Sequence, residues 1–198
     1  MSVPRLFNRI YDKVMAGLHA KGAVSQFLFK HAFNTKKKNL QSGQLTHWLW
    51  DSVVFSAIKS KLGGRVRVMV TGSAPISSDV MDFLRVCFSC QVYEGYGQTE
   101  TAAASAVTQI NDWTSGHVGA PVPCNEIKLV DIPEMDYFST DKPFPRGEIC
   151  FRGENCFKGY YKDEAKTNET LIDGWVHSGD VGMWDEQGRL HIIDRKKK

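Results

Sequence analysis

The chain has 198 residues, of which 42% are hydrophobic and 24% are charged, and these values are ordinary for one folded globular unit, or one and a fraction. Its formal net charge of +3 is too small to indicate a nucleic-acid-binding protein. No apolar run approaches the roughly 18 residues that a membrane-spanning helix requires, and the opening MSVPRLFNRIYDKV lacks the apolar core of a signal peptide. We therefore expect an intracellular segment that does not span a membrane, with peripheral membrane contact left open.

Helical periodicity dominates the first 62 residues. Apolar side chains recur at helical spacing in three stretches, around residues 6–18, 24–31 and 48–62. The dipeptide Gly63-Gly64 ends this region. We expect three helices before the first strand.

A strand, a turn, a helix and a second strand are expected next. Residues 66–70 carry a strand pattern that ends in the turn Thr71–Pro75. Ser77 or Ser78 can cap a helix, and a short strand around 91–93 then leads into YEGYGQTE. This order predicts an α/β fold with a mostly parallel sheet. Ligands bind such sheets beyond the carboxyl ends of the strands, so the loops after the two strands are expected to line one crevice.

After about residue 115 the pattern becomes β-rich. Gly- and Pro-containing turns separate short strand-like stretches. We expect residues 1–115 to form the α/β portion and residues 116–194 a small barrel-like subdomain. The expected elements of the second part are strands at 126–130, 148–152, 175–177, 181–184 and 190–194, and one helix at 163–172.

Some conspicuous features have a simple structural interpretation. The basic runs Lys36–Lys38 and Arg195–Lys198 are expected to be solvated surface. Five cysteines are an odd number, so reduced thiols are favoured over a disulfide framework. Cys87 and Cys90 have the spacing of a redox or zinc motif, but no second pair follows, and Cys87 falls on the apolar side of a helix. Packing is therefore favoured over metal binding for this pair.

The stretch from Gly95 to Glu100 is a candidate ligand loop. A tyrosine between two glycines can present its ring to a planar ligand, because glycine tolerates positive φ. The hydroxyl of Thr99 can contact a phosphate, and Glu100 offers a hard oxygen to Mg²⁺. Chemistry alone favours the alternative of a tight turn with a solvated glutamate.

Two further candidates lie near strand ends. Asp180, beside a glycine, can accept hydrogen bonds from the hydroxyls of a ribose, and the alternative is a hairpin turn. Arg195 can pair with a phosphate or with ribose oxygens, and the alternative is the start of a basic surface run. His177 is expected to pack rather than to catalyse. The sequence contains no GxxxxGK[ST], GxGxxG or HExxH motif.

Taken in order, these stretches resemble the adenylate-forming (AMP-binding) ligase superfamily of acyl-CoA synthetases, luciferases and peptide-synthetase adenylation domains. YGQTE at 96–100 is similar to the YGxTE signature, and GWVHSGD at 174–180 to GWxxTGD, with Ser178 where threonine is usual. TGSAPIS at 71–77 resembles the adenine-flanking turn, and GRLHIIDRKKK at 188–198 resembles the stretch that leads into the hinge before the small domain. SVPRLFNRIYDK and IIDRKK favour the long-chain fatty acid–CoA ligases.

The resemblance implies a role for each matched position. Tyr96 would stack on adenine, Asp180 would hold the ribose hydroxyls, and Lys196 would lie at the hinge. Catalytic positions would be Thr99, Glu100 and Arg195, with Glu100 as the metal ligand. Nucleotide-binding positions would be Gly72, Ser73, Ala74, Pro75, Glu94, Gly95, Tyr96, Gly97, Thr99, Asp180 and Arg195.

The implied reaction has two steps. A long-chain fatty acid attacks the α-phosphate of MgATP to give acyl-adenylate and pyrophosphate, and the thiol of CoA then displaces AMP. ATP, Mg²⁺ and CoA (as co-substrate) are thus the implied cofactors, and no nucleic acid is involved. The implied parent enzyme would act at the cytosolic face of the endoplasmic reticulum or at the peroxisome.

The resemblance also implies parts that these residues do not contain. A Gly/Ser/Thr-rich phosphate loop would lie upstream, and a small domain carrying a reactive lysine would follow Arg195. We therefore expect part of the large domain, cut at the hinge (195–198), which makes neither acyl-adenylate nor acyl-CoA by itself. The alternatives are a non-catalytic nucleotide-binding or interaction module, and an adenylate-forming ligase for a different acid.

Overall fold

The computed structural model describes residues 2–196, which form two compact units. The first unit runs to Tyr93 and includes Ile110–Gly116, and the second comprises Glu94–Gln109 and the chain from His117 onward. The chain therefore leaves the first unit, returns to it and leaves it again. This grouping differs from the single boundary near residue 115 that the sequence suggested, and the functional domain limits stay a prediction.

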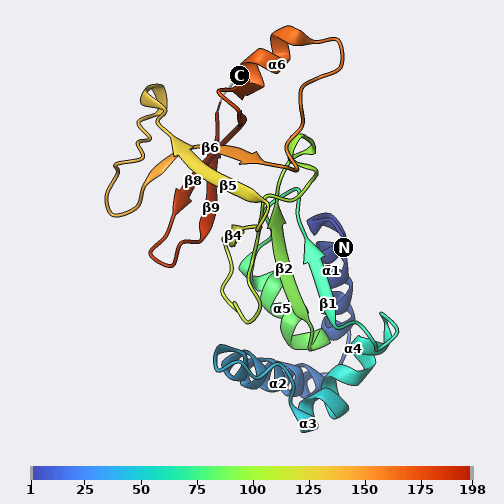
Figure 1. Ribbon diagram of the computed structural model, residues 1–198. Helices are drawn as coiled ribbons and strands as arrows, with labels where there is room; N and C mark the ends of the chain where they lie inside the picture. The colour runs from blue at the N-terminus through green and yellow to red at the C-terminus, as the bar shows by residue number, and fades with distance from the viewer. Residues whose placement is uncertain (1, 197–198) are drawn as a thin grey trace. The chain divides into compact units, whose positions relative to one another are not determined.

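Helices make up most of the first unit (Figure 1). Pro4 occupies the first position of α1, where its missing N–H costs nothing. The expectation of a helical region before the first strand is confirmed. Its elements are α1 (Pro4–His19), α2 (Ala23–Gln41), α3 (Trp48–Trp50), the π-helical turn η1 (Asp51–Phe55), α4 (Ser56–Ser60), β1 (Val68–Thr71), α5 (Ser78–Phe88) and the start of β2 (Gln91–Tyr96).

Helix α5 connects the two strands of this unit. The Ser77 hydroxyl caps it by accepting a hydrogen bond from the amide of Val80, and Asp79 in the first turn favours the positive end of the helix dipole. The left-handed Ser89 (φ 48°) ends it. β1 and β2 are neighbours in the sheet, and their arrows point the same way in Figure 1. The expected α/β pattern with a parallel pair is thus present.

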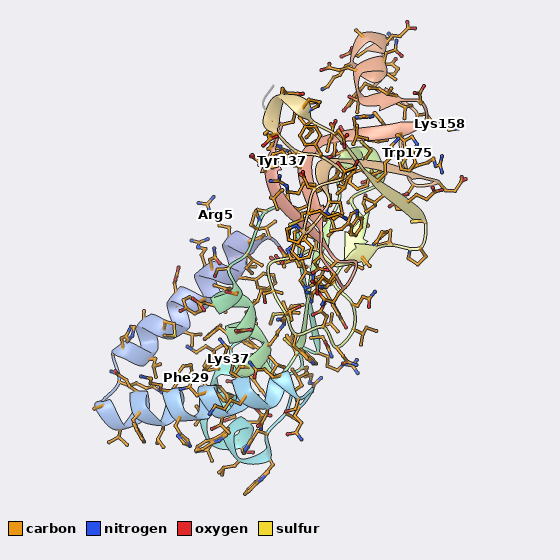
Figure 2. All side chains as sticks on the ribbon, turned by 90° about the vertical axis from the view of Figure 1, so that its left-hand side faces the viewer. Arg5, Phe29, Lys37, Tyr137, Lys158 and Trp175 are labelled. Carbon is orange, nitrogen blue, oxygen red and sulfur yellow. The ribbon has the colours of Figure 1, made fainter. Side chains whose placement is uncertain are left out.

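The interior of the first unit contains a buried arginine beside its apolar core. The guanidinium of Arg85, fully buried on α5, donates to the carbonyl oxygens of Trp113 (2.7 Å) and Thr114 (3.2 Å). These bonds tie the returning segment to the first unit. On α2, Phe29 packs in the core while Lys37 reaches Asp82 of α5 at 2.7 Å (Figure 2).

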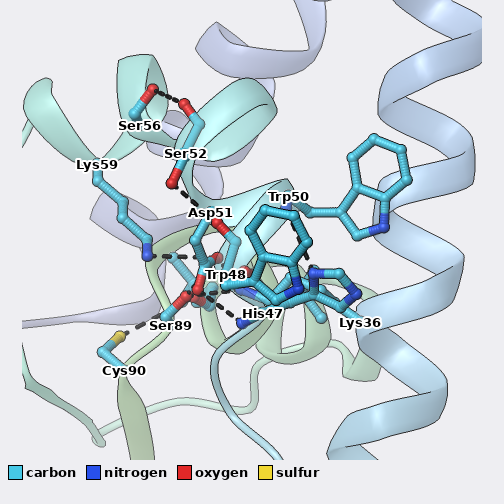
Figure 3. A network of polar contacts seen from close by, with 12 residues as sticks. Lys36, His47, Trp48, Trp50, Asp51, Ser52, Ser56, Lys59, Ser89 and Cys90 are labelled. Carbon is cyan, nitrogen blue, oxygen red and sulfur yellow. Dashed lines mark hydrogen bonds and ion pairs between the residues drawn. The ribbon is translucent and has the colours of Figure 1, made fainter.

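Lys36 corrects the expectation that the basic run Lys36–Lys38 is solvated. Its side chain is 1% exposed, and its ammonium bonds the Asp51 carboxylate (2.5 Å) and the Ser89 hydroxyl (2.6 Å), both labelled in Figure 3. It also bonds the Val86 carbonyl oxygen (2.7 Å). Burial lowers the pKa of Lys36, although Asp51 opposes this. Helical spacing turns this lysine inward, whereas Lys37 is half-buried and Lys38 is exposed.

The five cysteines are free thiols. Cys87 and Cys90 are buried, and burial raises the pKa of Cys90 to about 12. The expectation that this pair packs is confirmed. No helix among residues 2–196 is both long and apolar enough to cross a bilayer.

The second unit is built mainly of antiparallel strands. The end of β2 pairs with β3, and β3 pairs with β4. A second sheet has the order β5-β6-β8-β7, with β9 also paired to β8. Its elements are the 3₁₀ turn η2 (Thr99–Thr101), β3 (Ala106–Val107), β4 (Ala120–Pro121), β5 (Asn125–Val130), the 3₁₀ turn η3 (Pro133–Met135), β6 (Arg146–Gly153), α6 (Glu164–Thr170), β7 (Leu171–Ile172), β8 (Trp175–Trp184) and β9 (Leu190–Arg195).

Two elements of this unit are longer than the sequence suggested. β2 continues through Glu94 and Gly95 to Tyr96, because Gly95 and Tyr96 pair with β3 rather than forming a loop. β8 is one strand over 175–184, so Ser178–Asp180 is not a hairpin turn between two strands. The chain remains β-rich here and packs around a core of its own, which includes Ile149, Phe151, Val176 and Leu190.

Candidate functional site

Strand β2 brings Tyr96 to Asp180, which lies on β8. The Tyr96 hydroxyl donates to Asp180 Oδ2 at 2.7 Å, across 84 positions of sequence. Its ring packs against Phe151, with a centroid distance of 5.7 Å. Burial, and then the charge of Asp180, raise the pKa of Tyr96. The phenol therefore stays protonated and acts as a fixed donor.

Gln98 is a second donor to the same carboxylate. Its side-chain amide donates to Asp180 Oδ2 (3.2 Å) and to the carbonyl oxygen of Ser178 (2.9 Å). Its backbone amide donates to Thr101, which sets the start of the 3₁₀ turn. Sequence reasoning did not select Gln98, since it occupies the variable position of YGxTE. The polar amide of Gln98 within the YGxTE motif is the one sequence feature that could have indicated a hydrogen-bonding role.

Arg195 completes the surroundings of Asp180. β9 pairs with β8 so that these two residues are opposite each other, and Arg195 Nε donates to Asp180 Oδ1 at 2.9 Å. Asp180 is 8% exposed, whereas the Arg195 side chain is 78% exposed. A carboxylate accepts about four hydrogen bonds. Tyr96, Gln98 and Arg195 supply three side-chain donors, so Asp180 is oriented but not saturated by them.

Glu100 lies in the 3₁₀ turn beside the exposed Thr99. Its Oε1 accepts a hydrogen bond from the Tyr160 hydroxyl, and its carbonyl oxygen accepts one from the Phe157 amide (2.7 Å). Burial, and then the bond to Glu100, raise the pKa of Tyr160. No motif or periodicity marks Tyr160, which is 60 positions away from Glu100 in sequence. Glu100 is half-buried and keeps a second carboxylate oxygen, so its donor chemistry fits a hard cation such as Mg²⁺.

The glycines of this stretch act differently from the expectation. Neither Gly95 nor Gly97 is among the described residues with positive φ, and the left-handed residues of the turn are Ala102 (φ 51°) and Ala103 (φ 70°). A Cβ on Gly97 would lie 2.7 Å from the carbonyl of Ala103. Gly97 is therefore required for close approach of two backbones. Glu94 is buried in β2, and its amide donates to the Thr108 hydroxyl (2.9 Å).

The predicted adenine-flanking turn lies in the first unit. Gly72 is half-buried, and Ser73, Ala74 and Pro75 are exposed. Ser73 adopts a left-handed conformation (φ 68°). The buried Ile76 anchors the turn on its far side. The crevice expected between this turn and the stretch 95–100 stays a prediction.

Lys196 follows directly on this cluster. Its backbone amide donates to the carbonyl oxygen of Gly179 at 2.7 Å, and its ammonium lies 3.4 Å from Glu148 Oε2. Glu148 was not selected from the sequence, where it belongs to an ordinary strand pattern. The expected hinge also covers Lys197 and Lys198, which lie outside the described residues.

Comparisons with known proteins agree on one family. Residues 1–161 match the family described as AMP-binding enzyme. The chain is 56% identical, over 99% of its length, to long chain acyl-CoA synthetase 7, peroxisomal, of Arabidopsis thaliana, and 50% identical, over 98%, to human long-chain-fatty-acid–CoA ligase 1. It spans 28% of the length of each. Among solved structures, the chain is similar to the A domain of carboxylic acid reductase from Segniliparus rugosus, solved in complex with AMP and a co-purified carboxylic acid. The match covers 98% of this chain and 26% of the reductase chain, with 28% sequence identity and a TM-score of 0.64.

Proposed function

Because the chain belongs to the AMP-binding enzyme family, we propose that it is the part of a long-chain fatty acid–CoA ligase that holds the adenosine of MgATP. The whole proposed reaction joins a fatty acid to AMP with release of pyrophosphate, and then transfers the acyl group to CoA. The names of the two relatives support this class of acid. The peroxisomal name of the Arabidopsis relative supports a peroxisomal location, and peripheral membrane association is part of the same proposal.

The observation that carries the proposal is the arrangement around Asp180. Ribose hydroxyls are donors, and a buried carboxylate fixed by Tyr96 and Gln98 presents acceptors to them. Arg195 pairs with the buried Asp180 through a side chain that is itself 78% exposed. The exposed guanidinium could turn toward a phosphate, provided that ribose hydroxyls replace it as donors to the buried carboxylate. Nucleotide binding would then free Oδ1 for the ribose.

Tyr96 and Thr99 would contact opposite ends of the nucleotide, the adenine and a phosphate. The bond from the Tyr96 hydroxyl to Asp180 fixes the ring, which would serve as the rigid platform on which adenine stacks. The exposed Thr99 hydroxyl would contact a phosphate. The turn Gly72–Pro75 would flank the adenine.

Glu100 would hold Mg²⁺ through its carboxylate. When bound, the ion would supply positive charge that neutralises the charge developing on the phosphate. The contribution of this chain is to position the carboxylate, and Tyr160 does so by donating to Oε1. Catalysis by these residues therefore rests on orientation and electrostatics, without a covalent intermediate on the protein.

Titration of the chain with MgATP, followed by isothermal calorimetry, tests the proposal. Asp180→Asn keeps the shape but removes the charge, and we expect binding at least about tenfold weaker, as for a lost hydrogen bond to a charged group. Glu186→Gln, an exposed position on the turn between β8 and β9, is the control and should bind as the wild type does. Equal affinity for Asp180→Asn and wild type would contradict the proposed ribose contact.

A further inference from the structure

Strand β8 contains a bulge at Ser178–Asp180, which we call the arch. Cys150 of β6 lies opposite His177, and Glu148 lies opposite Val181. One residue of β6 thus faces three residues of β8, Ser178–Asp180. Gly179, near the middle of this arch, has a φ of 72°. Bulges of this kind redirect side chains and leave backbone groups without a ladder partner.

Glu148 supplies bonds that the ladder lacks. Its Oε1 accepts from the amide of Gly179 at 3.1 Å, and its Oε2 accepts from His177 Nδ1 at 3.0 Å. The residue is 5% exposed. A carboxylate can only accept, so Nδ1 of His177 carries the hydrogen. The carboxylate therefore bonds β8 at two positions before Asp180, the side chain of His177 and the amide of Gly179.

Lys196, the residue that follows β9, contacts the same arch. Its amide donates to the carbonyl oxygen of Gly179, while its ammonium lies 3.4 Å from Glu148 Oε2. The peptide groups of Gly179 are thus bonded on one side to Glu148 and on the other to Lys196. Lys196 is also the residue after Arg195, which binds Asp180.

We propose that Glu148 is a positioning residue that joins the Ser178–Asp180 arch to Lys196, and so sets the orientation of Asp180 and Arg195 toward the nucleotide. This rests on the proposed function, because the orientation matters only if Asp180 binds the ribose.

A metal site and a catalytic relay at Glu148, Cys150 and His177 are less consistent with the contacts of these residues. Ligand atoms of Glu148, Cys150 and His177 lie within 4.8 Å of one another, as in a metal site. However, the Glu148 carboxylate already faces the Lys196 ammonium and accepts hydrogen bonds from His177 and Gly179, so it has partners without a metal ion. Cys150 and Glu148 also approach the same ring nitrogen of His177, which does not permit a relay through the imidazole.

The test combines hydrogen exchange with MgATP titration of the chain. For Glu148→Gln we expect about tenfold faster exchange at the Gly179 amide and about tenfold weaker MgATP binding, as for loss of a charged hydrogen bond. The matched control is Glu126→Gln, on the adjacent strand β5, where the side chain is 61% exposed and pairs with Arg152. This control should change neither quantity.

Lys196→Met makes the test specific for positioning, and it also serves if Glu148→Gln does not fold. It should reproduce both effects, and the double variant should be no weaker than Glu148→Gln alone, because both act through one contact. Fully additive effects, or unchanged exchange at Gly179 in either single variant, would overturn the inference. Zn²⁺ binding by the wild type that is lost in Cys150→Ser would overturn it in favour of a metal site. A wild-type chain that does not bind MgATP would count against the proposed function alone, and the exchange data would still decide the role of Glu148.

Discussion

Replacing Tyr96 with phenylalanine removes one hydroxyl and leaves the ring in place. The lost bond is a 2.7 Å contact between a partly buried phenol and a carboxylate that is 8% exposed. Hydrogen bonds to charged groups contribute about 1.5–3 kcal/mol. Asp180 keeps Gln98 and Arg195 as donors, so we expect the lower end of this range, about 1.5 kcal/mol of unfolding free energy.

Urea unfolding at neutral pH, followed by far-UV circular dichroism, measures this change. Tyr161→Phe is the matched control, because that side chain is exposed and bonds no carboxylate among the contacts described for it. The same Tyr96→Phe variant should bind MgATP more weakly, since the orientation of Asp180 is less restricted. A free energy of unfolding equal to that of the wild type would refute the assignment of Tyr96 as a donor that fixes Asp180.

Three further outcomes follow from other contacts. Lys36→Met removes a buried cation that pairs with Asp51, and it should lower the free energy of unfolding in urea by about 3 kcal/mol. Lys37→Met removes a partly exposed pair and should lower it by only about 0–1 kcal/mol. Equal losses in the two variants would contradict the burial of Lys36. Gly97→Ala should lose about 1–3 kcal/mol through overpacking, while Gly17→Ala, inside α1 with nothing near its Cβ, should gain about 1 kcal/mol in the same assay. Burial alone would raise the pKa of Asp185, but hydrogen bonds from His191 and Arg189 outweigh burial and hold this pKa below its usual range. The stability that the ionised Asp185 contributes is therefore present above about pH 4 and is lost as the pH falls below that value. Asp185→Asn should therefore flatten the acid limb of a plot of stability against pH, and an unchanged acid limb would rule this out.

Local pattern predicted the helices and the order of the strands because these depend on neighbours in sequence. The apolar spacing of α1 and the serine cap of α5 are examples. The candidate residues Tyr96, Asp180 and Arg195 were selected separately, and the structure brings them into hydrogen-bond contact. Their proposed roles toward a nucleotide stay predictions.

The features that the sequence could not reveal depend on long-range pairing. The contact of Glu148 with Gly179 exists only because three residues of β8 face one of β6. The hydroxyl of Tyr160 bonds Glu100 although the two residues are 60 positions apart, and no sequence periodicity indicates such a contact. Lys36 looked like its two neighbours in a basic run, and only the packing of α2 distinguishes it from them.

The return of the chain to its first unit has a consequence for dissecting the protein. Arg85 is fully buried and donates to carbonyl oxygens of Trp113 and Thr114, in a segment that follows β3 of the second unit. A truncation after Tyr93 would remove these acceptors and leave a desolvated guanidinium behind. No single cut separates the two units. An independently folding first unit would have to be made by joining residues 2–93 to 110–116 through a short new linker.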